Sequence, residues 1–174
     1  ELLTFIPHEF IAPAGVKQDE HIIHLGNPSM KIGKGCREWG LIEVKSAHDP
    51  DTLQTAGLDF LWVTEAQDVP DKAFEKLLPT LRSPERLSRA IYEGIPPTYS
   101  DHWFHRVYMA GVRGTKDMRS FNATSFANPL LTAVDKAEIE SDQELLPSRV
   151  WRRMYMAEFA EGGGYFANIQ ECIN

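Results

Sequence analysis

The chain has 174 residues, of which 43% are hydrophobic and 25% are charged, and these fractions are typical of a globular domain with its own core. The formal net charge of −7 argues against a surface built to coat nucleic acid, although a local basic patch is compatible with it. No apolar run approaches the roughly 18 residues that would cross a membrane.

Short apolar runs alternate along the chain with segments of helical periodicity. Runs bounded by turn residues predict strands, and apolar side chains that recur every three or four positions predict helices. The predicted strands cover residues 20–26, 41–47, 58–64, 89–97 and 120–126. The predicted helices cover residues 71–81, 102–114, 132–145 and 148–160, and residues 1–11 are expected to end a further helix before a turn at Pro7. This alternation indicates an α/β fold with a mostly parallel sheet and flanking helices.

Residues 58–69, LDFLWVTEAQDV, carry the clearest functional signal. A short apolar run that stops at polar residues predicts a buried parallel strand, and ligands of open α/β sheets bind at the carboxyl ends of such strands. The strand around residues 90–94 should end beside it, which would bring Glu65 close to Glu93 and Gly94. The simpler alternative is that Glu65 only begins the next helix, where an acid in the first turn is favourable.

In ATP-hydrolysing P-loop proteins, acidic residues at such a strand end act on the magnesium ion and the attacking water. These proteins also have a phosphate-binding loop, G-x-x-x-x-G-K-[ST]. The nearest match is PSMKIGKG at residues 28–35. Pro28 replaces the first glycine, Gly35 replaces the hydroxyl residue, and no predicted helix follows to receive phosphate on its N-terminus. We therefore expect a glycine-rich hairpin or loop there, and no phosphate cradle within this chain.

Four segments together resemble the ATPase domain of the large terminase subunit of tailed bacteriophages. The resemblance extends over residues 1–168, and the order and spacing of the segments are more specific than any single motif. The segments are LIEVKSAHDPDTLQTAGLDFLWVTEAQDVPDKAFEKLLPTLRS (41–83), AIYEGIPPTYSDHWFHRVYMAG (90–111), SFNATSFANPLL (120–131) and SRVWRRMYMAEFAEGGGYF (148–166).

The resemblance implies a P-loop NTPase-like fold of the ASCE or RecA type, incomplete at the N-terminal side. Residues 1–168 would be the later portion of the ATPase domain, and residues 169–174 would begin a linker toward a nuclease domain that is absent here. The chain begins with Glu1 instead of methionine, which also leads us to expect a part of a longer protein.

The resemblance also implies roles for individual residues. Glu65 stands where the family has the catalytic carboxylate that orients the attacking water. Thr64 stands at the position of the magnesium-associated aspartate, where a hydroxyl is a weaker ligand. Glu93 and Gly94 match the coupling segment that senses the γ-phosphate, although they replace its usual Ser or Thr.

Other positions carry weaker signals. Gln54 and Thr55 occupy the places of the arginine and glycine of the family's linker, so a trans-acting arginine there is in doubt. Asn128 and Pro129 match a turn of the lid region and are expected to form a plain turn. Three arginines on the last helix either contact DNA phosphates or only keep one face solvated. They are Arg149, Arg152 and Arg153.

Histidine and cysteine usage predicts neither a metal site nor a disulfide framework. The pair His21 and His24 would point to opposite faces of a strand. The pair at positions 102 and 105 could share a helix face, but no Cys or carboxylate cluster completes a tetrahedral zinc site there. The two cysteines, Cys36 and Cys172, fit a reducing compartment.

For the full-length protein, the resemblance implies an ATPase that drives viral DNA into procapsids, with ATP and Mg²⁺ as cofactors that this chain alone does not hold tightly. The implied partners are double-stranded DNA, the portal protein, the small terminase subunit and further copies in a ring on the procapsid, in the cytoplasm of the infected bacterial host and away from any membrane. Two alternatives stay open: a helicase-like ATPase of superfamily 2, and a P-loop-derived interaction module in which Thr64 marks the loss of hydrolysis.

Overall fold

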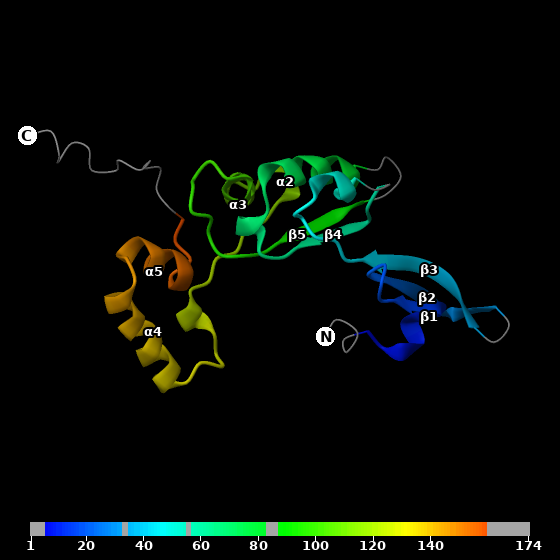
Figure 1. Cartoon of the computed structure of the whole chain (residues 1–174), viewed down its shortest axis with the longest axis horizontal. Helices are drawn as coiled ribbons and strands as arrows, with labels where there is room; N and C mark the ends of the chain where they lie inside the picture. Colours follow the sequence, from blue (N-terminus) through cyan, green and yellow to red (C-terminus); the bar gives the residue numbers. More distant parts are fainter. Residues whose placement is uncertain (1–5, 33–34, 55–56, 83–86, 160–174) are drawn as a thin grey trace, which may run out of the picture. The chain divides into compact units, whose positions relative to one another are not determined.

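The computed structural model describes residues 6–32, 35–54, 57–82 and 87–159. The chain divides into two compact units, Glu1–Ala47 and His48–Asn174, and each contains its own sheet (Figure 1). Within the part of the chain that the structure describes, no helix is both long enough and apolar enough to span a lipid bilayer.

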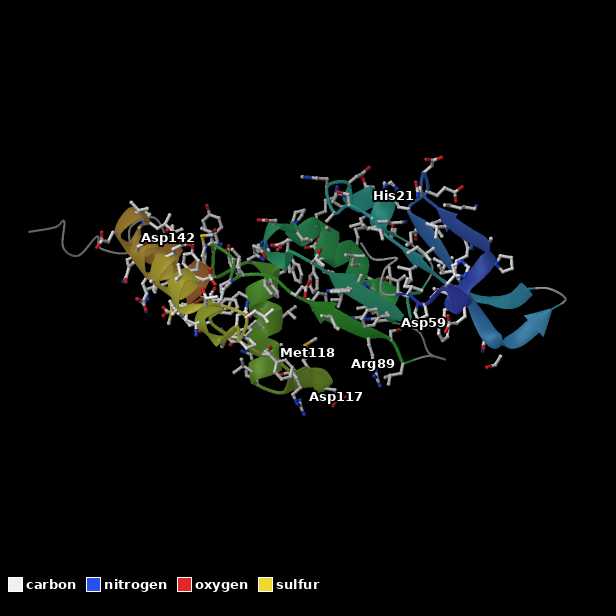
Figure 2. The ribbon with its side chains drawn as sticks, turned by 90° about the horizontal axis from the view of Figure 1, so that it is seen from below. His21, Asp59, Arg89, Asp117, Met118 and Asp142 are labelled. Carbon is white, nitrogen blue, oxygen red and sulfur yellow. The ribbon has the colours of Figure 1, made fainter. Side chains whose placement is uncertain are left out.

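The first unit is a three-stranded antiparallel sheet in the order β1-β2-β3. Its strands are β1 (Ile11–Lys17), β2 (Ile22–Ile32) and β3 (Gly35–Glu43), and the 3-10 helix η1 (His8–Phe10) precedes them. His21 adopts a left-handed conformation, with φ of 56°, in the turn that joins β1 to β2 (Figure 2). Such short turns join only antiparallel neighbours, because a parallel neighbour needs a long crossover.

The predicted strands at residues 20–26 and 41–47 overlap β2 and β3, but β3 ends at Glu43, so the prediction is wrong for residues 44–47, and β1 was not predicted. The expected helix end at residues 1–11 is wrong for residues 6–11, where Pro7 leads into η1 and β1 begins at Ile11, while residues 1–5 lie outside the described residues. Pro13 weakens a strand pattern because it cannot donate to the ladder. It is tolerated here because β1 is an edge strand whose pairing with β2 shifts between Ile11 and Val16.

The prediction of a glycine-rich hairpin or loop at residues 28–35 is confirmed as a hairpin for the residues that the structure describes. Residues 28–32 complete β2, and Gly35 begins β3 in antiparallel pairing with Ile32. The segment that follows is therefore a strand, so it does not offer the helix N-terminus of a phosphate-binding loop. Residues 33–34 lie outside the described residues.

The second unit contains two parallel strands, β4 (Phe60–Val63) and β5 (Arg89–Tyr92), with α2 (Asp71–Leu77) between them along the chain. The 3-10 helices of this segment are η2 (Pro50–Leu53), η3 (Ala66–Asp68) and η4 (Leu78–Leu81). The predicted α/β character is confirmed. The prediction of a mostly parallel sheet is wrong for the described strands, because the three strands of the first unit are antiparallel and only β4 and β5 are parallel.

One face of the β4–β5 pair carries the core of this unit. Trp103, the first residue of α3 (Trp103–Val112), is fully buried and stacks on Phe74 of α2, with ring centroids 4.3 Å apart. Tyr92 of β5 meets Trp103 edge to face at 5.5 Å. The opposite face is open, since Phe60 and Trp62 of β4 are 53% and 54% exposed.

The last two helices, α4 (Ala133–Leu145) and α5 (Ser148–Tyr155), pack against each other. A capping box between Thr132 and Asp135 begins α4. The Trp151 indole N–H of α5 donates to the carbonyl of Ile139 at 2.8 Å. The Tyr155 hydroxyl donates to Asp142 of α4 (Figure 2) at 2.7 Å. These bonds fix the pair of helices side by side.

The strand predicted at residues 120–126 is wrong. The chain after α3 passes through η5 (Thr115–Asp117) and η6 (Ser125–Ala127), and residues 118–124 form neither a helix nor a strand. Phe121 is 90% exposed, so the apolar pattern of this segment has no sheet to pack on. The helix predicted at residues 148–160 also ends early, because Ala157 turns left-handed with φ of 52°.

Candidate functional site at the strand ends

The carboxyl ends of β4 and β5 lie side by side, as the sequence predicted for Glu65, Glu93 and Gly94. The backbone N–H of Glu93 donates to the carbonyl of Val63 at 3.0 Å, and the N–H of Ala66 donates to the carbonyl of Glu93 at 2.9 Å. The parallel ladder therefore continues past β4 into the turn that carries Glu65. Both glutamate side chains are exposed at this edge.

Glu65 has a left-handed backbone conformation, with φ of 50° and ψ of 47°. A residue with a Cβ costs about 1 to 3 kcal/mol in such a region, and conformations of this kind cluster at functional sites. Glu65 caps η3 without a side-chain capping bond, and α2 begins only at Asp71. Glu65 thus begins the next helix, η3, as the simpler alternative holds, but as its N-cap and not as an acid of its first turn.

Gln67, which is not among the residues predicted from the sequence, contacts the carboxylate of Glu65. Its Nε2 donates to Glu65 Oε2 at 2.7 Å, and its Oε1 accepts from the N–H of Ile95 at 3.1 Å. Gly94 lies against the same amide, because a Cβ there would be 2.1 Å from Gln67 Oε1 and 2.9 Å from the nitrogen of Ala66. Position 94 therefore requires glycine, because Gln67 and the backbone of Ala66 lie too close for a Cβ. The residue pattern E-x-Q after a strand is the signal that could have drawn attention to Gln67.

The remaining residues implied by the resemblance lie apart from this contact network. Thr64 is exposed at the end of β4, directly before Glu65, and Gln54 ends η2. Thr55 lies outside the described residues. Asn128 Oδ1 accepts from the N–H of Leu130 at 3.0 Å, which is the plain turn that was predicted.

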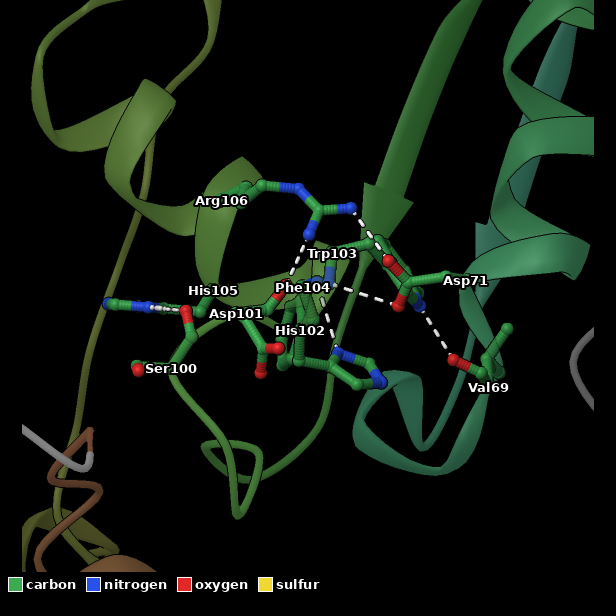
Figure 3. Close-up of polar contacts among 9 residues, drawn as sticks. All are labelled: Val69, Asp71, Ser100, Asp101, His102, Trp103, Phe104, His105 and Arg106. Carbon is green, nitrogen blue, oxygen red and sulfur yellow. Dashed lines mark hydrogen bonds and ion pairs between the residues drawn. The ribbon is translucent and has the colours of Figure 1, made fainter. Parts of the chain in front are cut away.

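Hydrogen bonds and an ion pair hold α3 against residues 69–71, which follow the site (Figure 3). Asp71 accepts from the backbone N–H of Trp103 at 3.4 Å and from the Arg106 guanidinium at 2.7 Å, and the Trp103 indole N–H donates to the carbonyl of Val69 at 2.6 Å. Burial raises the pKa of Asp71, but the Arg106 hydrogen bond, the Trp103 N–H and the charges of Arg106 and His102 outweigh it. The pKa of Asp71 therefore lies below the usual 3.8.

The histidines at positions 102 and 105 take part in local hydrogen bonds. His102 Nδ1 accepts from the N–H of Phe104 at 3.2 Å, and His105 Nδ1 lies 2.6 Å from the carbonyl of Ser100 (Figure 3). The structure, over the residues that it describes, contains no group of three or more His, Cys, Asp or Glu side chains arranged to hold a metal ion.

Each of the three arginines of α5 has a partner within the chain. Arg149 Nη2 donates to the carbonyl of Thr98 at 2.8 Å, and Arg153 Nη1 donates to the carbonyl of Pro96 at 3.1 Å. Arg152 pairs with Glu158 at 2.5 Å. The first two bonds hold the segment after β5 against α5, and a contact with DNA stays a prediction that no observation tests.

Comparison with known proteins gives a consistent result. The family model described as "Phage terminase large subunit" matches residues 17–158. The ATPase domain of the large terminase of Thermus phage P74-26 is similar in structure, with a TM-score of 0.67 and 22% identity over 87% of this chain and 64% of that one. A point mutant of that domain gives a TM-score of 0.64 and 21% identity over 83% and 62%. The chain thus spans less than two thirds of those structures, and no curated protein matches it.

Proposed function

Because this chain belongs to the phage terminase large subunit family, we propose that it is part of the ATP-hydrolysing motor that packages viral DNA into procapsids. The observation that carries the proposal is the place of Glu65, an exposed carboxylate at the carboxyl end of a parallel strand beside the end of β5. ATP-hydrolysing relatives of the P-loop type use a carboxylate at such a strand end. No match supports the helicase or the interaction-module alternative.

Glu65 is proposed to orient and polarise the water that attacks the γ-phosphate. The left-handed turn and the Gln67 hydrogen bond fix the carboxylate, so less reorganisation is needed when the substrate binds. Glu93 and Gly94 are proposed as the coupling segment, because their backbone is hydrogen-bonded to the turn of Glu65. A change at either strand end would then reach the other.

Magnesium and ATP fit this chain only in part. Mg²⁺ takes oxygen ligands, and the exposed Thr64 hydroxyl and Glu65 carboxylate are oxygen groups at the strand end. The residues that the structure describes supply no group of three acidic or imidazole ligands. The ion would promote phosphoryl transfer by neutralising phosphate charge. We propose that Thr64 approaches it through a water and that most of its ligands come from the nucleotide and from residues outside this segment.

The chain is further proposed to be the later portion of the ATPase domain, within residues 1–168, with residues 169–174 leading toward a nuclease domain. Parallel sheets are normally covered on both faces. Phe60, Trp62 and Ile91 form an exposed apolar face on the β4–β5 pair, each at least 50% exposed. Further strands and helices of a P-loop domain of the ASCE type would cover this face and supply the phosphate-binding loop.

In the full-length protein the proposed partners are double-stranded DNA, the portal protein and the small terminase subunit, with copies of the protein forming a ring on the procapsid. The motor would act in the cytoplasm of the infected bacterial host. The exposed apolar face of β4 and β5 supports the view that other segments complete the motor.

The experiment that tests the proposal is the substitution Glu65→Gln in the full-length protein. It should lower ATP turnover by about 100-fold or more, in the range seen for loss of a general base, while ATP binding stays close to that of the wild type. Glu75→Gln is the matched control, because it removes the same charge from an exposed position of α2. Wild-type turnover in the Glu65→Gln protein would reject the role assigned to this carboxylate.

A second experiment addresses the chain by itself, which we propose is inactive. Affinity for a nucleoside triphosphate comes mainly from backbone N–H groups and a lysine around the phosphates, whereas residues 28–32 belong to β2 and Gly35 begins β3. Calorimetric titration with a non-hydrolysable ATP analogue and Mg²⁺ should show no saturable heat up to about 1 mM, which corresponds to about 4 kcal/mol of binding. A micromolar dissociation constant would contradict the proposal that the phosphate cradle lies elsewhere.

A further inference from the structure

Gln67 joins the two strand ends through its side-chain amide. Its Nε2 donates to Glu65 Oε2 at 2.7 Å and to Asp68 Oδ2 at 3.2 Å, and its Oε1 accepts from the backbone N–H of Ile95 at 3.1 Å. Ile95 belongs to the segment that leaves β5, whereas Glu65 belongs to the turn that leaves β4. One amide therefore connects the carboxylate to the backbone of the neighbouring strand end.

The partners of Gln67 determine the orientation of its amide. A backbone N–H can only donate, and an ionised carboxylate can only accept. If the amide were rotated by half a turn, its NH₂ group would face the N–H of Ile95 and its oxygen would face the carboxylates of Glu65 and Asp68. All three hydrogen bonds would be lost, so Gln67 can present only its N–H groups to Glu65.

The surrounding backbone limits how far this amide can move. Gln67 lies in η3, whose first residue, Ala66, is fully buried and donates its N–H to the carbonyl of Glu93 at 2.9 Å. On the other side the amide lies against Gly94, where a Cβ would be 3.3 Å from Gln67 Cδ and closer still to Oε1. The half-buried amide is therefore held between the Glu65 turn and the backbone after β5.

We propose that Gln67 is a positioning residue for ATP hydrolysis, which fixes the Glu65 carboxylate relative to the Gly94–Ile95 backbone. This inference rests on the proposed function, because Gln67 acts only through Glu65. A carboxylate with one oxygen bound to a fixed N–H keeps a single orientation toward the attacking water. A shift of the Ile95 N–H moves the same amide, so Gln67 also transmits the state of the coupling segment to Glu65.

The first test is Gln67→Leu in the full-length protein, assayed for ATP turnover. The substitution removes both hydrogen-bonding functions at similar volume, so we expect kcat to fall by about 10- to 100-fold, as for a misplaced reactive group. The KM for ATP should stay within about twofold, because binding depends on the phosphate cradle. Gln143→Leu, at an exposed position of α4, is the matched control and should retain wild-type kcat.

The second test is Gln67→Glu, which keeps the size of the side chain and an acceptor for the N–H of Ile95 but replaces the N–H donor to Glu65 with a carboxylate. Two carboxylates at this distance repel each other, so Glu65 loses its fixed orientation. We expect kcat to fall about as far as in Gln67→Leu, while the KM for ATP and the urea midpoint stay close to those of the wild type. A residue that only supports the fold would lower kcat and the urea midpoint together.

The outcomes separate this inference from the proposal on which it rests. Wild-type turnover in Glu65→Gln would overturn both. Loss of turnover in Glu65→Gln together with wild-type kcat in Gln67→Leu would overturn the role of Gln67 alone. Wild-type kcat in Gln67→Glu would also overturn it, whereas a lower kcat at constant KM and an unchanged urea midpoint in Gln67→Glu would establish it.

Discussion

Trp103 is the residue whose replacement should most directly weaken the support of the strand-end site. It is fully buried, and its indole N–H donates to the carbonyl of Val69, in the segment that follows Glu65, at 2.6 Å. Its ring also stacks on Phe74, with an interplanar angle of 9°. Trp103→Phe keeps an aromatic ring in the core but removes the N–H and reduces the volume.

The expected loss of stability follows from these two changes. Without the indole N–H, the carbonyl of Val69 is buried and has lost its donor, which costs about 1 to 3 kcal/mol. The smaller ring leaves a gap where two carbon atoms and the indole nitrogen were, and the loss of the two carbons costs about 1.6 kcal/mol more. The free energy of unfolding should therefore fall by about 3 to 5 kcal/mol, a large part of the stability of a typical domain.

Urea unfolding of the 174-residue chain, followed by far-ultraviolet circular dichroism, measures this loss. The signal reports the second unit, because helices α2 to α5 all lie there. Trp62→Phe is the matched control, since Trp62 is 54% exposed and the same substitution there should change stability by about 0.5 kcal/mol or less. A loss below about 1 kcal/mol in Trp103→Phe would show that the Val69 carbonyl finds another donor, and the reasoning from this bond would be refuted.

The remaining predictions concern the site and its supports. Gly94→Ala should lower kcat about tenfold or more, because the new Cβ would lie 2.1 Å from Gln67 Oε1 and displace that amide. Gly57→Ala is the control and should retain wild-type turnover, because its Cβ would lie 3.6 Å from the nearest atom, the Thr80 carbonyl oxygen. The pKa of Asp71 lies below 3.8, so its ionised form contributes to the free energy of unfolding above pH 3.8. This contribution is lost as the pH falls through the lowered pKa. Asp71→Asn should therefore flatten the decline of stability below pH 3.8 in acid unfolding curves. Arg153→Met removes the hydrogen bond to the carbonyl of Pro96 and should lower the urea midpoint by the equivalent of about 1 kcal/mol. An unchanged midpoint would mean that water replaces the guanidinium there.

The order of most elements could be predicted from the sequence, because hydrophobic periodicity reports which face of an element is buried. It identified the strands at 58–64 and 89–97 and the four helices, although it overestimated their lengths. It failed for β1 because Pro13 breaks the strand pattern, and only the edge position of β1 makes that residue acceptable. It also failed at residues 120–126, where strand-forming residues have no neighbouring strand to pair with.

The position of Glu65 could also be predicted, since a carboxylate directly after a parallel strand must lie at the carboxyl end of the sheet. The prediction that this strand is buried is wrong for one of its faces, because Phe60 and Trp62 are exposed. The contact with Gln67 could not, because it depends on the left-handed conformation of Glu65 and on the approach of Gly94. The arginines of α5 show the same limit. Their spacing indicated a basic face, but the hydrogen bond of Arg149 to the carbonyl of Thr98 joins residues 51 positions apart.

These contacts form a continuous path from the candidate catalytic carboxylate to the last helix. The Gln67 amide connects Glu65 to the N–H of Ile95, and the next residue, Pro96, accepts a hydrogen bond from Arg153 of α5. A motor of this kind must convert a change at the γ-phosphate of its nucleotide into the movement of another element. Two sites are coupled when both shift the equilibrium of one element that has two states. The segment 93–98 is the candidate for that element, because one of its ends is bonded to the Glu65 turn and the other to α5. If it is, Gln67→Leu and Arg153→Met should each reduce the DNA translocated per ATP hydrolysed, beyond any effect on ATP turnover.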